Sequence, residues 1–103
     1  MSLSVKRGNY GFALTFNVKN SDGSAKNLTG YTVTLKVWAS GSESCKFTGT
    51  CTVTDAANGI CTYTVANGDF ATVGQYLAEL ELTKTGVVED TETFPILVEA
   101  TAP

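Results

Sequence analysis

The sequence predicts an all-β protein in which two antiparallel sheets pack face to face, built from about seven or eight short strands. Three observations favour this fold class. Apolar and polar residues alternate along several segments, as in strands with one buried and one solvent-exposed face. Turn sequences rich in glycine, asparagine and aspartate separate these segments at intervals of about 8–12 residues. No segment has helical periodicity, and the length suits one domain, residues 1–103.

Two clear strands are expected in the first half of the chain, after a short strand at residues 3–6. One covers residues 12–18, and its buried face consists of Phe12, Leu14, Phe16 and Val18. The other covers residues 31–38, with a core face of Tyr31, Val33, Leu35 and Val37. The Asp22-Gly23 pair between them is a strong turn signal, and Leu28 is expected to close one end of the core.

A short edge strand is expected over residues 43–48, and a hairpin follows it. The arms of the hairpin are residues 50–54 and 60–65. Between them, the Asn58-Gly59 pair supplies the positive φ that a tight hairpin turn needs.

The segment from Asp69 to Leu82 organises the second half of the chain. Residues 69–74 are expected to form one tight turn, and the next strand buries Tyr76 and every second residue after it. A tyrosine directly after such a turn can bury its ring and send its hydroxyl back to the loop backbone, as in the tyrosine corner of immunoglobulin-like sandwiches. We therefore assign structural roles to Asp69, Gly74 and Tyr76, with an ordinary core tyrosine as the alternative.

The last strand is expected over residues 87–98. Its inward residues are Phe94, Ile96 and Val98. Pro95 has no N–H to donate to a neighbouring strand, so its part of this strand must be an edge or a bulge.

The three cysteines, Cys45, Cys51 and Cys61, lie within one short span of the sequence. The chain as given has no signal peptide, and an odd number of cysteines then indicates reduced thiols. Cys51 and Cys61 could face each other across the hairpin, so a disulfide between them remains the alternative.

Charge is distributed unevenly along the chain. Residues 1–50 contain six basic and two acidic residues, whereas residues 51–103 contain one basic and eight acidic residues. The favoured interpretation is that strands from the two halves lie side by side and neutralise each other. The alternative is a basic arm that meets an acidic partner.

The net charge of −3 argues against a nucleic-acid partner, and no apolar run approaches the ~18 residues of a membrane span.

The composition argues against catalysis and against a cofactor or metal site. There is no histidine, so a Ser-His-Asp or Cys-His arrangement is impossible within this chain, and no catalytic residue is assigned. Glu79 and Glu81 share a strand face, but a glycosidase pair of carboxylates needs a cleft, and this face is expected to be solvated. Glu89, Asp90 and Glu92 lack the ligand spacing of a calcium loop.

One sheet face is expected to carry an interface. In an immunoglobulin-like layout the strand at 31–38 neighbours the strand that begins at Tyr76, which places Lys36 near Glu79 or Glu81. The same outward face would carry three large apolar residues, Trp38, Leu77 and Leu97. Such a cluster usually marks a protein interface. The alternative is that a bulge turns Trp38 inward, or that the three residues are too scattered to form a patch.

Five motifs follow one another in an order that resembles a known family. They are NLTG at residues 27–30, TVTLKVW at 32–38, TVTDAANGICTYTV at 52–65, DFATVGQYLAELEL at 69–82 and ETFP at 92–95. In this order they resemble the immunoglobulin-like N-terminal domain of phage baseplate upper proteins and related prophage tail modules. The resemblance covers about residues 8–98.

The resemblance implies a non-enzymatic structural role in the virion. Such domains dock tail or receptor-binding components in several symmetric copies, so the expected partners are other tail or baseplate proteins, together with further copies of this chain. The expected location is the tail or baseplate, after synthesis in the bacterial host cytoplasm. The alternative is a cell-surface adhesion or carbohydrate-binding module of similar fold.

Overall fold

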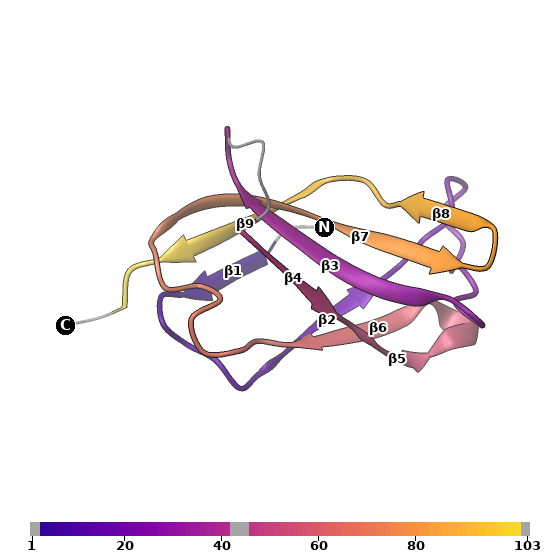
Figure 1. The fold of residues 1–103 in the computed structure, drawn as a ribbon, viewed down its shortest axis with the longest axis horizontal. Helices are drawn as coiled ribbons and strands as arrows, with labels where there is room; N and C mark the ends of the chain where they lie inside the picture. The colour runs from indigo at the N-terminus through magenta and orange to yellow at the C-terminus, as the bar shows by residue number, and fades with distance from the viewer. Residues whose placement is uncertain (1–2, 42–45, 102–103) are drawn as a thin grey trace.

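The computed structural model describes residues 3–41 and 46–101, which form a two-layered β-sandwich (Figure 1). The described residues contain nine strands and one short 3₁₀ turn, η1. In chain order the elements are β1 (Leu3–Lys6), β2 (Ala13–Asn17), β3 (Thr32–Ala39), β4 (Phe47–Thr50), β5 (Thr52–Asp55), η1 (Ala56–Asn58), β6 (Ile60–Thr64), β7 (Gly74–Lys84), β8 (Val87–Asp90) and β9 (Phe94–Glu99). No helix in this part of the chain is long and apolar enough to cross a membrane.

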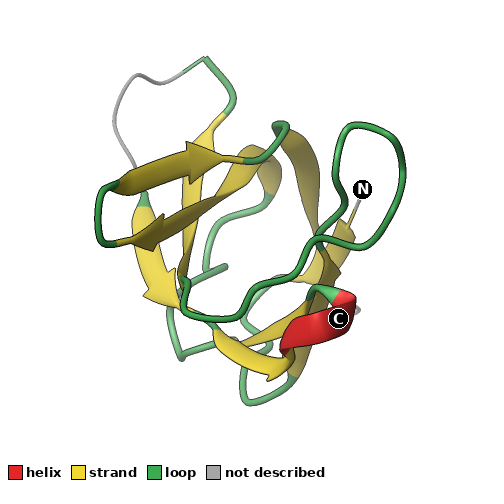
Figure 2. Cartoon of the chain, turned by 90° about the vertical axis from the view of Figure 1, so that its right-hand side faces the viewer, coloured by secondary structure: helices red, strands yellow, loops and turns green. Residues whose placement is uncertain are grey.

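The strands form two sheets that enclose one core. The larger sheet has the order β1-β9-β7-β3-β4, with β8 also paired to β7, and the smaller sheet has the order β2-β6-β5. The pairing is antiparallel throughout except between β1 and β9, which run parallel. Figure 2, turned by a quarter from Figure 1, shows the strands surrounding the interior between the two layers. This topology confirms the predicted immunoglobulin-like sandwich.

Alternation along the strands decides which residues enter the core. In β3 and β7 every second side chain is buried, and β2 buries Leu14 and Phe16 in the same way. Phe12 lies just outside β2 and is exposed, so the core face of this strand is shorter than expected. Leu28 is 1% exposed and closes one end of the core. The ring of Phe16 meets that of Phe94 with centroids 5.7 Å apart, which places β2 over β9.

The chain crosses from one sheet to the other at Cys51. β4 pairs with β3 in the larger sheet, whereas β5 pairs with β6 in the smaller one. Cys51 lies between β4 and β5, and its N–H donates to the Val33 carbonyl at 2.8 Å. The edge strand expected at residues 43–48 is observed as Phe47–Thr50, so it continues two residues further along the chain than expected. Residues 43–45 of that expectation lie outside the described residues.

The predicted turn before β6 is confirmed. Residues 56–58 form η1, and Gly59 follows with φ of 70°. A Cβ atom on Gly59 would come within 2.6 Å of the main-chain oxygens of Val18 and Lys26. Glycine is therefore required here for its backbone angle and for space.

The single strand expected over residues 87–98 is two strands in the structure. Thr91 interrupts it, because its Oγ1 accepts the N–H of Leu80 at 2.9 Å and its own N–H donates to the Leu80 carbonyl. A side chain thus takes the place of a strand backbone group. β8 and β9 consequently pair with different parts of β7, and Pro95 lies one residue before β1 begins to pair with β9 at Ile96.

Candidate interaction surface

The three apolar residues predicted for an interface lie on the outer face of the larger sheet. Trp38 of β3 stands directly opposite Leu77 of β7, and Pro95 of β9 stands opposite Leu77 on its other side. Leu97 pairs with Gln75, two residues from Leu77, and so lies diagonal to it. Below, these four residues, Trp38, Leu77, Pro95 and Leu97, are called the apolar patch.

Regular strand pairing holds the apolar patch outside the core. The register between β3 and β7 runs without interruption from the Thr32–Thr83 pair to the Ala39–Tyr76 pair, so no bulge turns Trp38 inward. Trp38 and Leu77 are half-buried, and Leu97 is 44% exposed. Pro95 was not predicted as part of this surface, because only its missing N–H was considered.

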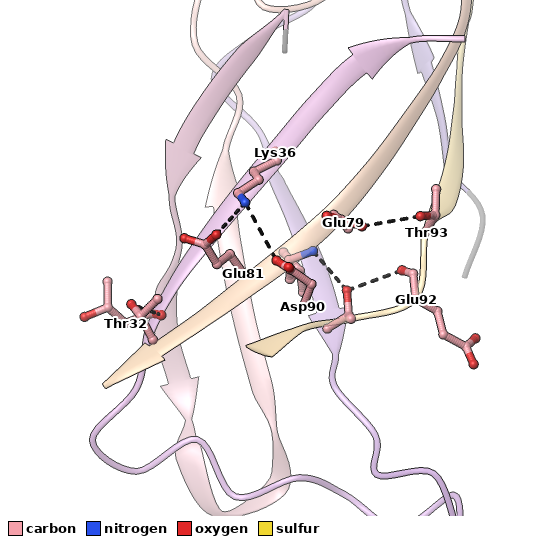
Figure 3. Close-up of polar contacts among 10 residues, drawn as sticks. Thr32, Lys36, Glu79, Glu81, Asp90, Glu92 and Thr93 are labelled. Carbon is pink, nitrogen blue, oxygen red and sulfur yellow. Dashed lines mark hydrogen bonds and ion pairs between the residues drawn. The ribbon is translucent and has the colours of Figure 1, made fainter. Parts of the chain in front are cut away.

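A charged cluster lies beside the apolar patch on the same face. Lys36 forms ion pairs with Glu81 and, at 3.7 Å, with Asp90 (Figure 3). The hydrogen bond to Glu81, helped by the charge of Asp90, holds the pKa of Lys36 above its usual value. Glu79 is turned toward Thr93, whose hydroxyl donates to it at 3.4 Å (Figure 3). The predicted closeness of Lys36 to Glu79 or Glu81 is confirmed.

Ion pairs among the described residues join the two oppositely charged halves of the chain. Besides the Lys36 cluster, Lys26 pairs with Glu89 at 3.1 Å and Lys6 pairs with Glu99 at 3.5 Å. Each of these pairs takes its cation from residues 1–50 and its anion from residues 51–103. Three of the six cations of residues 1–50 are thus paired with carboxylates of residues 51–103, so the favoured interpretation holds for this part of the charge.

The loop before β7 contains a tyrosine corner. The Tyr76 ring is buried, and its hydroxyl donates to the Thr72 carbonyl, four residues earlier, at 2.9 Å. This is the hydrogen-bond geometry that defines the corner. Gly74 begins β7 with φ of 155°.

Asp69 closes a turn that lies earlier than expected. Its Oδ2 accepts the N–H of Ala66 at 2.9 Å, and its N–H donates to the Ala66 carbonyl, so the turn spans residues 66–69 rather than 69–74. The same Oδ2 accepts the hydroxyl of Tyr63 at 2.5 Å. Burial, together with this bond, raises the pKa of Tyr63. The pairing of Tyr63 with Asp69 was not predicted, although only six residues separate them, because Asp69 was assigned to a turn that leads into β7 and not to the turn that follows β6.

Two of the thiols lie together inside the core. Cys51 and Cys61 are buried and are not bridged. Contact with the Cys61 thiol, together with burial, raises the pKa of Cys51, so this thiol is protonated at neutral pH. The third cysteine, Cys45, lies outside the described residues.

A cleft of about 580 Å³ opens between the sheets where β2 ends. Its apolar lining includes Val18, Leu80, Leu82 and Phe94. Glu89, Asp90 and Glu92 also line it, but two of these carboxylates already bind lysines. Among the described residues, no three acidic, cysteine or histidine side chains gather closely enough to hold a metal ion.

The comparisons with known proteins agree on one kind of domain. The family model described as "BppU N-terminal domain" matches residues 7–102. Among solved structures, the chain is similar to the N-terminal domain of phage TP901-1 ORF48, with a TM-score of 0.74 and 19% sequence identity, over 94% of this chain and 83% of that one. At this identity the structural likeness shows the fold. No curated protein sequence matches the chain significantly.

Proposed function

The chain belongs to the family of BppU N-terminal domains, which are the N-terminal domains of phage baseplate upper proteins, and we propose that it docks other tail or receptor-binding components onto the baseplate. Family membership makes it a structural module of the phage tail or baseplate. The proposal adds that it acts in several symmetric copies, by protein–protein contacts, after synthesis in the host cytoplasm. Neither nucleic acid nor a membrane is among its proposed partners.

The observation that carries this proposal is the apolar patch. Trp38 and Leu77 face each other across two central strands, on a face that strand parity directs away from the core. Aromatic and aliphatic side chains gathered at one place on a surface are typical of interface centres. The Lys36–Glu81–Asp90 cluster beside them supplies the polar margin that such interfaces have.

A non-enzymatic role is part of the proposal. The sequence has no histidine, and the acidic side chains near the apolar patch are engaged by Lys36 and Thr93. The two thiols of the core are buried away from any substrate. In this proposal the apolar patch binds another macromolecule by shape and apolar contact.

The test is a Trp38→Glu substitution in baseplates assembled without the native protein. We expect incorporation of the variant to fall at least about tenfold, because a carboxylate would be buried without a partner at the centre of the contact. Thr64→Glu is the matched control, since it adds the same charge to an exposed position on the outer face of the smaller sheet. Circular dichroism and thermal unfolding check that both variants fold.

Equal incorporation of the two variants would exclude the apolar patch as the docking surface. Loss of incorporation by Thr64→Glu alone would move the docking site to the smaller sheet. Failure of the unmodified domain to join any baseplate would contradict the proposed function itself.

A further inference from the structure

The smaller sheet ends in an open edge at β2. In an immunoglobulin-like sandwich the sheet that contains the second strand normally has the first strand at its edge. Here the first strand, β1, pairs with β9 in the larger sheet instead. Among the described residues, no strand pairs with β2 on the side away from β6. One strand position of the smaller sheet is therefore empty.

The hydrogen-bond parity of β2 shows which backbone groups face this empty position. At the end of the strand, the N–H of Val18 donates to Gly59 on the β6 side at 2.8 Å. Alternate residues of an antiparallel strand direct their N–H and C=O groups to opposite sides. The residues whose groups face the open edge are accordingly Ala13, Thr15 and Asn17, and all three are exposed.

β2 lacks the features that usually protect an edge strand from further pairing. Such strands carry lysine, proline or a bulge. β1 has Lys6, and β5 has a shift of register between Val53 and Asp55. β2, with the sequence ALTFN, has neither a charge nor a proline, and its pairing with β6 is regular.

The open edge leads directly to the cleft between the sheets. Asn17 and Val18 line one side of the cleft, and Phe94 and Leu80 line its interior. A strand added beside β2 would direct alternate side chains toward the core side of the sheet. One of them would lie beside this cleft, which Lys19 and Glu92 also line and whose apolar residues Val18, Leu80 and Phe94 are already buried.

We infer that β2 accepts an extended segment of a neighbouring baseplate subunit as an added strand, held by main-chain hydrogen bonds to Ala13, Thr15 and Asn17. The identity of the partner rests on the proposed function. The site is a different surface from the apolar patch, and the two surfaces would bind different parts of the assembly.

A second copy of this chain is a poor occupant for this edge. Two β2 strands would pair about a twofold axis perpendicular to the smaller sheet, which places both larger sheets on the same side. β2 lies over β9, as the contact of Phe16 with Phe94 shows, and β1 extends the larger sheet one strand further out. The β1 strands of the two copies would then collide, whereas a single extended segment fits.

The first test uses the free domain and does not depend on the baseplate. The probe is a capped heptapeptide of alternating threonine and valine with a lysine at each end, added while amide NMR signals are followed. We expect saturable shifts at Ala13, Thr15 and Asn17. They should persist in Thr15→Val and vanish in Thr15→Pro, which removes an N–H that β6 does not use. No saturable shift in the unmodified domain would overturn the inference.

The second test places the same variants in the baseplate. We expect Thr15→Pro to lower incorporation about tenfold, from the loss of main-chain hydrogen bonds, and Thr15→Val to leave it unchanged. Amide exchange at Thr15 should be fast in the free domain and slow in the assembly. Equal incorporation of Thr15→Pro, or fast exchange in the assembly, would overturn the inference even if Trp38→Glu blocks docking. Peptide binding to a domain that joins no baseplate would support the open edge and contradict only the proposed function.

Discussion

The ring of Tyr63 lies against the main chain of Gly49, and a Cβ atom on residue 49 would overlap this ring. Gly49 belongs to β4 of the larger sheet and Tyr63 to β6 of the smaller one, so this contact joins the two layers. The Tyr63 hydroxyl is held by Asp69, which limits how far the ring can move aside. Close packing of the layers at this end thus depends on a residue without a side chain.

A methyl group at this position should destabilise the domain. We expect Gly49→Ala to lower the free energy of unfolding by about 1–3 kcal/mol, because the ring must leave its place or the sheets must separate. Urea unfolding measures this difference. Thr48→Ala, at an exposed neighbouring position, should cost less than about 1 kcal/mol. Similar losses in both variants would show that the ring tolerates the methyl group.

The tyrosine corner should contribute measurably to stability. We expect Tyr76→Phe to cost about 0.5–1.5 kcal/mol, because the buried ring stays in place while the hydrogen bond to Thr72 is lost. The control is Tyr10→Phe, since Tyr10 is 58% exposed. If the two variants unfold at the same urea concentration, the hydroxyl of Tyr76 has no structural role.

The charged cluster should show coupling that depends on its burial. A double-mutant cycle with Lys36→Met and Glu81→Gln should give a coupling of about 0.5–1 kcal/mol, since both side chains are only 27% exposed and Asp90 adds to the network. The comparison pair is Lys6 with Glu99, whose side chains are 54% and 43% exposed. Its coupling should be smaller and should vanish in about 1 M salt. Equal coupling in the two cycles would contradict the role given to burial.

Stability should fall in alkaline solution because of Tyr63. Its pKa is raised in the folded state by burial and by its hydrogen bond to Asp69, whereas the unfolded chain has the ordinary value of about 10. The stabilisation is therefore complete below about pH 10 and is lost as the pH rises through the folded-state pKa. The raised pKa of Lys36 acts in the same direction.

Tyrosinate absorbance and urea unfolding, followed together, check this pH dependence. One tyrosine should ionise only as the protein unfolds, and Tyr63→Phe should remove that late step. A Tyr63→Phe variant with an unchanged absorbance titration would assign the late step to another tyrosine.

Sequence alternation predicted the faces of the strands well, because parity is a local property. Leu35 points into the core and Lys36 out of it, as their positions in β3 require. The same parity placed Trp38 and Leu77 on the outer face. That they stand directly opposite each other follows from the register between β3 and β7, which the structure supplies.

Features that depend on the partner strand could not be predicted in this way. Cys51, where the chain crosses from the larger to the smaller sheet, is buried like a core residue of a strand. Alternation therefore does not distinguish this crossing from a continuous strand. The interruption at Thr91 depends on the N–H of Leu80, eleven residues earlier in the chain. Phe70 is 1% exposed, but alternation did not reveal it because it lies in a loop.

The pairing of charges between the two halves of the chain also has a consequence for biosynthesis. The first fifty residues leave the ribosome with six basic and two acidic groups, and the carboxylates that neutralise Lys6, Lys26 and Lys36 are translated later. β7, the central strand of the larger sheet, also comes late. The nascent amino-terminal half therefore remains an unfinished, positively charged polypeptide, and the domain folds only when nearly all of it has emerged.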